Sequence, residues 1–377
     1  MRGKLEPEGY KQSDGNKIRH PVSMYRNIGD NVQKNGLILV DIVYCVRRMN
    51  MIIYKYKERC SIIKNKESKM EKKFPNGMWP VMLTPLQQNG DVDYPALEEL
   101  INWYIKEGSS GLFAVCQSSE MFYLSMEERE ELTRFIKKAA NGRVPVISSG
   151  HVSYSLHDQI QELNGIAEAG ADAVILLSNR LAAANESDEV LIERLKNIMS
   201  ELPENLPLGF YECPYPYKRI LSPKVVEFCA DSGRFYFLKD TCCDIEGIRK
   251  KLEIMKGSNM KLYNANTSTL LESMKYGAAG YSGVMANFHP ALYAWLLENW
   301  EKEPEKAEYL QDILTPCSFI ELKNYPLSAK TYLAKEIGFS IKARTRKNTA
   351  DYISETELSE LRQIKELSDR AMEFISK

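Results

Sequence analysis

Histidine is scarce in this sequence, and its cysteines lack the spacing of a metal site. The 377 residues include only four histidines, and no two of the eight cysteines form a C-x-x-C pair. A metal-dependent aldolase or hydrolase needs several His, Asp or Glu ligands that converge on one ion. We therefore expect no metal and no cofactor, and the sequence disfavours a metal-dependent lyase.

The sequence also has almost no net charge and no long apolar run. Its formal net charge is −1, which excludes a general polyanion binder, so we expect no nucleic-acid partner. The apolar stretch at 36–46 is too short to span a bilayer and contains Asp41, and no secretory signal precedes it. Because the cysteines are scattered, we expect a reduced, cytoplasmic location and no membrane attachment.

Charge is distributed unevenly along the chain. Residues 1–69 carry 15 Lys and Arg against 7 Asp and Glu (+8), which leaves 35 against 44 (−9) for the remainder. This basic segment shows no helical or strand periodicity, whereas the globular pattern begins near Asn76. Lys66-Glu67 can be encoded by AAG-GAG, a ribosome-binding sequence two codons before Met70. We therefore predict a non-native leader or a disordered basic extension; a basic anchoring arm is the alternative.

From residue 79 onward, short apolar runs alternate with helical patterns. Each run is uniformly apolar, as strands of a parallel sheet are when both of their faces are buried. A doubly wound sheet is the competing fold, but residues 84–91 lack the glycine-rich phosphate loop that usually follows its first strand. The eight predicted strands are WPVMLT (79–84), GLFAVC (111–116), VPVISS (144–149), AVILLS (173–178), LGFYE (208–212), FYFLKD (235–240), KLYNA (261–265) and GYSGV (280–284).

Eight strand–helix units are typical of a (β/α)8 barrel. We therefore predict an α/β fold, a TIM barrel over residues 70–300, with a C-terminal helical appendage over residues 301–377. SMEE (125–128) is a capping box, and Ser222-Pro223 is an N-cap followed by proline. The last helix, at 354–375, should bury a stripe made of Leu358, Leu361, Ile364, Leu367, Ala371 and Phe374.

In such barrels the chemistry lies at the carboxyl ends of the strands. Lys239 and Tyr211 end neighbouring strands, and the apolar residues before Lys239 should lower its pKa toward the neutral amine that attacks a carbonyl. A nearby tyrosine can relay the protons. The alternative is a lysine paired with Asp240 or merely solvated. The full set of predicted strand ends is Thr84, Gln117-Ser118, Ser149, Ser178, Tyr211, Lys239, Asn264 and Ser282.

Five short stretches together match the pattern of one enzyme family. They are PVMLTPL (80–86), CQSSE (116–120), YECP (211–214), LKD (238–240) with GAAGYSG (277–283), and ANFHP (286–290). Over roughly residues 76–342 the chain resembles the dihydrodipicolinate synthase / N-acetylneuraminate lyase family of Schiff-base lyases. This resemblance implies a barrel that forms an imine with a 2-oxo acid such as pyruvate.

The resemblance also implies a role for each matching position. Lys239 matches the imine lysine, and Tyr211 matches the tyrosine that relays protons. Ser118 matches the hydroxyl residue that holds the keto acid's carboxylate, with Ser119 supplying a further backbone amide. Gly283 lies near the bend under the keto acid.

The chain departs from the family pattern around the second substrate. Gln117 stands where the synthase has the threonine of its proton relay, whereas Glu120 matches a glutamate that we expect to be structural. The synthase's cross-subunit tyrosine maps onto Leu181, and its arginine after the Y-N-x-P turn maps onto Pro216. The loop instead offers Tyr215, Tyr217 and the pair Lys218 and Arg219, which we expect to be solvated. The second-substrate site therefore looks rebuilt.

Four further residues are weaker candidates. We expect Cys116, Cys242 and Cys243 to be buried, inert thiols. Glu212 either hydrogen-bonds a substrate hydroxyl or braces its own turn.

The residues and the resemblance together predict a cofactor-free Schiff-base lyase, an aldolase or dehydratase that acts on a 2-oxo acid such as pyruvate. The second substrate is open. The alternative is a catalytically altered barrel that binds a small carboxylic acid as a sensor or partner. The resemblance implies a homo-oligomer, a tetramer or a dimer.

If residues 1–69 are a leader, they contribute nothing to stability. A protein that begins at Met70 should then melt at the same temperature as the full chain, as measured by differential scanning calorimetry. A melting temperature several degrees lower in the shorter protein would refute the leader hypothesis.

Overall fold

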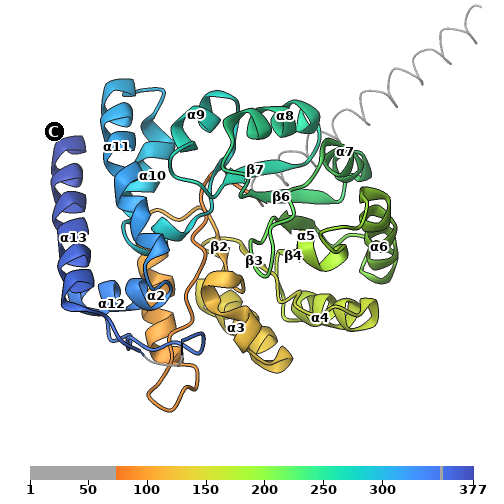
Figure 1. Cartoon of the computed structure of the whole chain (residues 1–377), viewed down its shortest axis with the longest axis horizontal. Coiled ribbons are helices and arrows are strands. Elements are labelled where there is room, and N and C mark those ends of the chain that lie inside the picture. The colour runs from red at the N-terminus through yellow and green to blue at the C-terminus, as the bar shows by residue number, and fades with distance from the viewer. Residues whose placement is uncertain (1–73, 349–350) are drawn as a thin grey trace, which may run out of the picture. The chain divides into compact units, whose positions relative to one another are not determined.

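The computed structural model describes residues 74–348 and 351–377; the predicted leader at 1–69 lies outside this part of the chain. Its eight strands form one parallel sheet in the order β1-β8-β7-β6-β5-β4-β3-β2 (Figure 1). A parallel bridge from Val81 to Phe113 joins the segment after β1 to β2 and closes the barrel. The strands are β1 (Gly77–Met78), β2 (Leu112–Phe113), β3 (Val146–Ser148), β4 (Ala173–Leu177), β5 (Leu208–Tyr211), β6 (Phe235–Asp240), β7 (Lys261–Asn264) and β8 (Gly280–Tyr281).

Helices separate the strands and surround them, which confirms the predicted α/β barrel (Figure 1). In the described ranges, no helix is both long and apolar enough to cross a bilayer. The barrel helices are α2 (Tyr94–Lys106), α3 (Met126–Ala140), α4 (Leu156–Glu168), α5 (Ser178–Leu181), α6 (Asp188–Glu201), α7 (Pro223–Ser232), α8 (Ile245–Met255), α9 (Leu270–Lys275) and α10 (Pro290–Asn299). The C-terminal helices are α11 (Pro304–Cys317), α12 (Leu327–Tyr332) and α13 (Glu355–Ile375).

The first strand differs most from its predicted bounds, and the second and last are shorter than predicted, whereas β6 has the bounds expected of it. β1 ends at Met78 because Pro80, which follows closely, has no N–H to donate to a ladder. The Pro80 carbonyl still accepts a hydrogen bond from the Phe113 N–H at 3.0 Å, so the chain stays beside β2. β8 ends early because a 3-10 helix, η5 (Val284–Asn287), begins soon after it.

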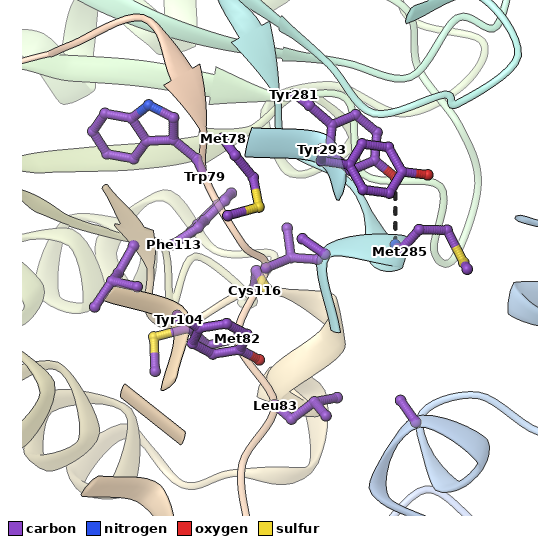
Figure 2. Packing of buried hydrophobic residues seen from close by; sticks show 14 of the residues in the cluster. Met78, Trp79, Met82, Leu83, Tyr104, Phe113, Cys116, Tyr281, Met285 and Tyr293 are labelled. Atoms are coloured by element: carbon purple, nitrogen blue, oxygen red, sulfur yellow. Dashed lines mark hydrogen bonds between the residues drawn. The ribbon is translucent and has the colours of Figure 1, made fainter. Parts of the chain in front are cut away.

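Aromatic rings fill the barrel below its carboxyl end. Phe237 stacks on Tyr263 at a centroid distance of 4.2 Å, and the Trp79 ring meets Phe237 edge-on at 5.2 Å. On the neighbouring strand β8, Tyr281 stacks on Tyr293 of α10, and the Tyr281 hydroxyl accepts from the Met285 N–H (Figure 2). The interior is therefore packed, as barrel cores are, and a cavity lies at its carboxyl end.

The predicted caps form as hydrogen bonds. The Glu128 N–H donates to Ser125 Oγ at 3.2 Å, and Glu128 Oε2 accepts from the Ser125 N–H at 2.9 Å, which completes a capping box on α3. Ser222 Oγ accepts from the Val225 N–H at 3.4 Å at the start of α7. Local sequence signals thus set the helix starts.

The predicted stripe of α13 is correct in part. Leu361, Ile364 and Ala371 are buried, but Leu367 and Phe374 are 42% and 41% exposed. Their places in the interface are taken by Ile375 and by Ser368, whose hydroxyl hydrogen-bonds His289 Nδ1 at 2.9 Å. The buried face is therefore rotated from the one that apolarity alone predicts, because a satisfied hydroxyl can be buried at little cost. In Figure 1 this helix lies beside α10, α11 and α12.

A buried carboxylate ties the C-terminal region to the barrel. Glu120, in the turn after β2, is 3% exposed, and its Oε1 accepts from Lys330 Nζ of α12 at 2.6 Å. Its Oε2 accepts from Thr345 Oγ1 at 2.8 Å and from the Arg346 and Lys347 N–H groups at 2.6 and 3.0 Å. Glu120 therefore has the structural position that the sequence suggested, and it holds the loop at 344–347 against the barrel mouth.

Candidate active site

Neighbouring strands bring Lys239 and Tyr211 side by side at the carboxyl end of the barrel. The two residues are register partners on β6 and β5, so their side chains leave the sheet on the same, inner face. Lys239 Nζ lies 4.2 Å from the centroid of the Tyr211 ring and 5.9 Å from that of Phe113. Each residue is only 4% exposed. An amine and a phenol thus share a desolvated, mostly aromatic floor.

The residues that follow, Glu212 and Asp240, lie on the outer face, where Lys251 of α8 contacts both. Lys251 Nζ donates to Asp240 Oδ2 at 2.6 Å and also to Glu212 Oε1. The Glu212 carboxylate additionally accepts from the Leu221 N–H at 2.8 Å and the Thr241 N–H at 3.0 Å. The alternative in which Lys239 pairs with Asp240 is therefore wrong, and Glu212 braces its turn.

Desolvation determines the charge state of both inner groups. Burial lowers the pKa of Lys239, although Cys116, Cys213 and Glu321 act in the opposite direction. Burial also raises the pKa of Tyr211 well above its usual value. At neutral pH the site therefore holds more neutral amine than a solvated lysine would provide, next to a protonated phenol that can donate a proton.

A cavity of about 410 Å³ opens above Lys239 and Tyr211. Gln117 and Ser118 line it from the turn after β2, and Gly283 lines it from the bend after β8. Ser119 is not among the residues that line the cavity. Its hydroxyl instead turns back to the chain: it accepts from the Cys116 N–H at 2.6 Å and donates to the Cys116 carbonyl at 2.9 Å. Four of the predicted binding and catalytic positions thus meet in one cavity with the lysine, while Ser119 shapes the turn beneath it.

Two of these residues have contacts that limit what they can do. The Tyr211 hydroxyl donates to Gln117 Oε1 at 3.3 Å, but an amide cannot pass the proton onward. At Gly283 a Cβ would lie 2.3 Å from the Tyr281 ring and 2.5 Å from the Ala265 carbonyl oxygen. A larger residue at Gly283 would therefore displace the cavity wall.

Three other residues predicted at strand ends form hydrogen bonds with groups of the protein itself. Thr84 Oγ1 donates to the Ser119 carbonyl at 2.9 Å, and Ser178 Oγ donates to the Arg219 carbonyl at 2.6 Å. Asn264 Nδ2 donates to Thr269 Oγ1 at 2.9 Å. Their polar side chains hold the loops that surround the cavity.

The C-terminal region contributes residues that the sequence analysis missed. Glu321, Tyr325 and Lys347 line the cavity opposite the strand ends. The Tyr325 hydroxyl accepts from Asn287 Nδ2 at 3.0 Å, and burial raises the pKa of this tyrosine well above its usual value. Asn287 belongs to the family-like stretch ANFHP, but nothing in the sequence indicated that its partner lies 38 residues further on.

Among the described residues, no three His, Cys, Asp or Glu side chains are grouped as metal ligands would be. His151 accepts from the Leu177 N–H at 3.0 Å through Nδ1 and hydrogen-bonds Gln159 through Nε2. Burial lowers the pKa of His151 to about 4, so it stays neutral and structural at neutral pH.

Comparison with known proteins agrees with this geometry. The model of the Dihydrodipicolinate synthetase family matches residues 74–366 of the chain. The chain belongs to this family. The family resemblance predicted from the five short stretches is therefore confirmed.

Relatives and solved structures show how closely the chain follows the family. The 4-hydroxy-tetrahydrodipicolinate synthase of Psychrobacter sp. (strain PRwf-1) is 31% identical over 214 residues, which cover 57% of this chain and 69% of that protein. The chloride-inhibited dihydrodipicolinate synthase of Acinetobacter baumannii, solved with pyruvate, covers 78% of this chain and 99% of its own at 24% identity and a TM-score of 0.69. YagE, a prophage protein of this family from E. coli K12, was also solved with pyruvate. The match covers 78% of this chain and 98% of YagE, at 22% identity and a TM-score of 0.69.

Leu181 and the loop after β5 hold the positions at which the sequence analysis expects a departure from the family pattern. Leu181 is fully buried in the apolar core. Asn179 Nδ2 donates to the carbonyls of Cys213, Tyr215 and Tyr217 at 2.7–2.8 Å and so holds the loop that carries Pro216. This loop has its own internal support, and it places Tyr215 in the cavity wall.

The prediction that Lys218 and Arg219 form a solvated pair is correct for Lys218, which is exposed, and wrong for Arg219. Arg219 forms an ion pair with Asp188 at 3.0 Å and donates to the Ala183 carbonyl at 2.6 Å. Lys218 lines the cavity and donates to the Thr241 carbonyl at 2.7 Å. The side chains of these consecutive loop residues point in different directions, so Lys218 faces the cavity whereas Arg219 binds the segment at 183–188.

The expectation for the cysteines is correct for Cys116 and wrong for Cys243. Cys116 is buried, Cys242 is half-buried, and Cys243 is exposed and lines the cavity. Desolvation raises the pKa of Cys242 to about 12 and also raises that of Cys243. Both remain protonated thiols at neutral pH and are weak nucleophiles there.

The contacts of Lys251 lead to a stability prediction. In Lys251→Met the carboxylates of Glu212 and Asp240 would stay buried without their cation, which should cost about 3–5 kcal/mol of unfolding free energy at neutral pH. Burial raises the pKa of Glu212, and protonation at falling pH removes the uncompensated charge, so the loss should shrink in acid. Denaturant titration at several pH values measures both effects.

The matched control is Lys250→Met, which removes an exposed ammonium from the same helix. It should change the unfolding free energy by less than about 0.5 kcal/mol. Equal effects of the two substitutions would contradict the proposed importance of the Lys251 contacts.

Proposed function

We propose that the protein is a Schiff-base-forming lyase that acts on a 2-oxo acid such as pyruvate, in the aldolase or dehydratase direction. The observation that carries this proposal is Lys239, a buried amine of lowered pKa beside Tyr211 at the floor of the cavity. Burying an amine without a paired carboxylate costs free energy, and an imine-forming lysine needs the neutral form that desolvation favours.

The chemistry proceeds from the free pair of electrons on Lys239. The neutral Nζ adds to the keto carbon, and Tyr211 returns the proton that it takes from the nitrogen to the oxygen, which gives a neutral carbinolamine. The new hydroxyl takes up a second proton, from solvent, and leaves as water, giving an iminium. Tyr211 lies close enough to Nζ to donate and recover protons during this collapse. The iminium then withdraws electrons from the neighbouring bond, which can break or form without a metal.

The turn at 117–119 is the proposed binding site for the acid's carboxylate. The Ser118 hydroxyl lines the cavity, and a hydroxyl together with backbone N–H groups would donate charge-assisted hydrogen bonds to a carboxylate. Ser119 has its hydroxyl engaged with Cys116, so only its backbone amide is proposed to contribute. Gly283 leaves the room in which the keto acid would lie.

The relatives support pyruvate more than they support a second substrate. Two family structures were solved with pyruvate, and the Psychrobacter relative is a 4-hydroxy-tetrahydrodipicolinate synthase. In this chain Gln117, Leu181 and Pro216 replace residues that the synthase pattern uses for proton relay and for its second substrate. We therefore propose a different second substrate from that of the synthase.

We also propose that the chain assembles as a homo-oligomer, a tetramer or a dimer, as the family resemblance implies. An exposed aromatic surface next to the site supports this proposal: Tyr154 is 73% exposed and covers the buried guanidinium of Arg180 at 4.4 Å. Sedimentation velocity on the full chain would give the state directly.

Covalent trapping tests the proposed function. Wild-type protein reduced with borohydride in the presence of pyruvate should gain the mass of one reduced adduct. Lys239→Ala should gain none, and Lys239→Arg should gain none because a guanidinium stays protonated. Lys218→Ala removes another amine from the same cavity and should keep the adduct.

Two results of that experiment would count against the proposal. An adduct that persists in Lys239→Ala would exclude Lys239 as the nucleophile. Absence of an adduct from wild type with pyruvate and with larger 2-oxo acids would favour a barrel that only binds a small acid.

The role of Tyr211 can be measured by the rate of trapping. Tyr211→Phe keeps the ring beside Lys239 but removes the proton donor, so imine formation should slow by about two to four orders of magnitude while the final adduct mass is unchanged. Quenched-flow reduction with borohydride gives this rate. Tyr276→Phe, at an exposed tyrosine outside the cavity, should match wild type; a Tyr211→Phe rate within threefold of wild type would remove the tyrosine from the mechanism.

A further inference from the structure

Glu321 is a carboxylate of the C-terminal region that lines the same cavity as Lys239. It lies in η6 (Ser318–Leu322), a 3-10 helix after α11, and it is half-buried. The second glutamate of the cavity wall, Glu120, has both oxygens engaged by Lys330, Thr345 and the loop amides. Within the described part of the chain, Glu321 forms no hydrogen bond or ion pair, and Lys239 and Lys218 are the cations that act on its carboxylate.

The proposed lyase needs a proton acceptor that its other cavity residues do not provide. Once the iminium has formed, a base must remove a proton from the adjacent carbon, C3 of pyruvate. Burial raises the pKa of Tyr211 and Tyr325 well above the usual value and that of Cys213 to about 11, so all three are protonated at neutral pH. Gln117 replaces the hydroxyl of the family's proton relay with an amide, which cannot carry a proton.

We propose that Glu321 is the catalytic base that takes the C3 proton from the Lys239 iminium. This proposal rests on the Schiff-base function proposed above. The proton moves to the Glu321 carboxylate, the C–H electron pair forms the C2=C3 bond of an enamine, and the C=N pair returns to nitrogen. When C3 then attacks the carbonyl of the second substrate, Glu321 returns its proton to the oxygen that becomes a hydroxyl.

The surroundings of Glu321 suit this task. Burial raises its pKa, which makes the carboxylate a stronger base, and the two lysines act in the opposite direction. The iminium keeps a positive charge at Nζ, which continues to attract the carboxylate during proton transfer. The charged and titratable groups around Glu321 come from β6, the loops after β5 and β6, β8, α10 and the segment after η6: Lys239, Lys218, Cys243, Tyr281, Tyr293 and Tyr325.

Methyl-proton exchange of pyruvate tests Glu321 without a second substrate. In deuterium oxide, wild-type protein should replace the pyruvate methyl protons with deuterium through the enamine, and proton NMR follows the loss of the methyl signal. Glu321→Gln should still give the borohydride adduct but should slow exchange by about 10²–10⁴-fold, the usual contribution of a general base. Glu321→Asp, which keeps a shorter carboxylate, should retain part of the rate.

The pH profile separates a base from a residue that only shapes the cavity. At saturating pyruvate, wild-type exchange should rise with pH as Glu321 loses its proton, and this rise should be absent from Glu321→Gln. Glu308→Gln makes the same change at an exposed position of α11 and should match wild type in rate and profile.

Three outcomes would overturn the assignment. Exchange by Glu321→Gln within threefold of wild type, with the adduct intact, would show that another group is the base. Loss of the adduct in Glu321→Gln and Glu321→Asp, with wild-type melting temperatures, would place Glu321 in imine formation instead. Absence of any adduct from wild type would reject the Schiff-base function itself, and the base with it.

Discussion

The ammonium of Lys251, buried behind the sheet between two carboxylates, is the contact on which the site depends most. Side chains alternate along a strand, so Glu212 and Asp240 face away from the cavity when Tyr211 and Lys239 face into it. Lys251 makes that arrangement stable by neutralising both carboxylates. Burial acts to lower its pKa, but the two carboxylates together raise it, so the cation is retained.

The same contact protects the chemistry of Lys239. Two uncompensated carboxylates on the adjacent residues would favour the charged form of its amine. Glu212 and Asp240 face away from Lys239 and are not among the groups that act on its pKa, so desolvation prevails. Two lysines in similar surroundings thus have opposite properties: one is held charged by its partners, and the other is kept closer to neutral by their absence from its side of the sheet.

Local and periodic features of the sequence predicted most of the fold. Uniformly apolar strands and the caps at Ser125 and Ser222 need only neighbouring residues to act, so the barrel and its helix starts could be inferred. The predicted stripe of α13 failed at Leu367 because the partner of Ser368 is His289, which is 79 residues distant. The reactive floor could also be inferred, since Lys239 and Tyr211 end adjacent strands. The place of Glu321 in the cavity could not be inferred from the sequence, because only tertiary packing brings η6 to the mouth of the barrel.

The buried pair of Glu120 and Lys330 places a condition on biosynthesis. Glu120 leaves the ribosome 210 residues before Lys330 and 225 residues before Thr345, so the turn that carries Gln117 and Ser118 is made long before its supports exist. A nascent chain that has completed all eight strands still has an uncompensated carboxylate at the barrel mouth, and it lacks one wall of the cavity. The order of synthesis therefore delays completion of the cavity until the loop at 344–347 has been translated, and a chain released early would carry Lys239 in an open, unfinished pocket.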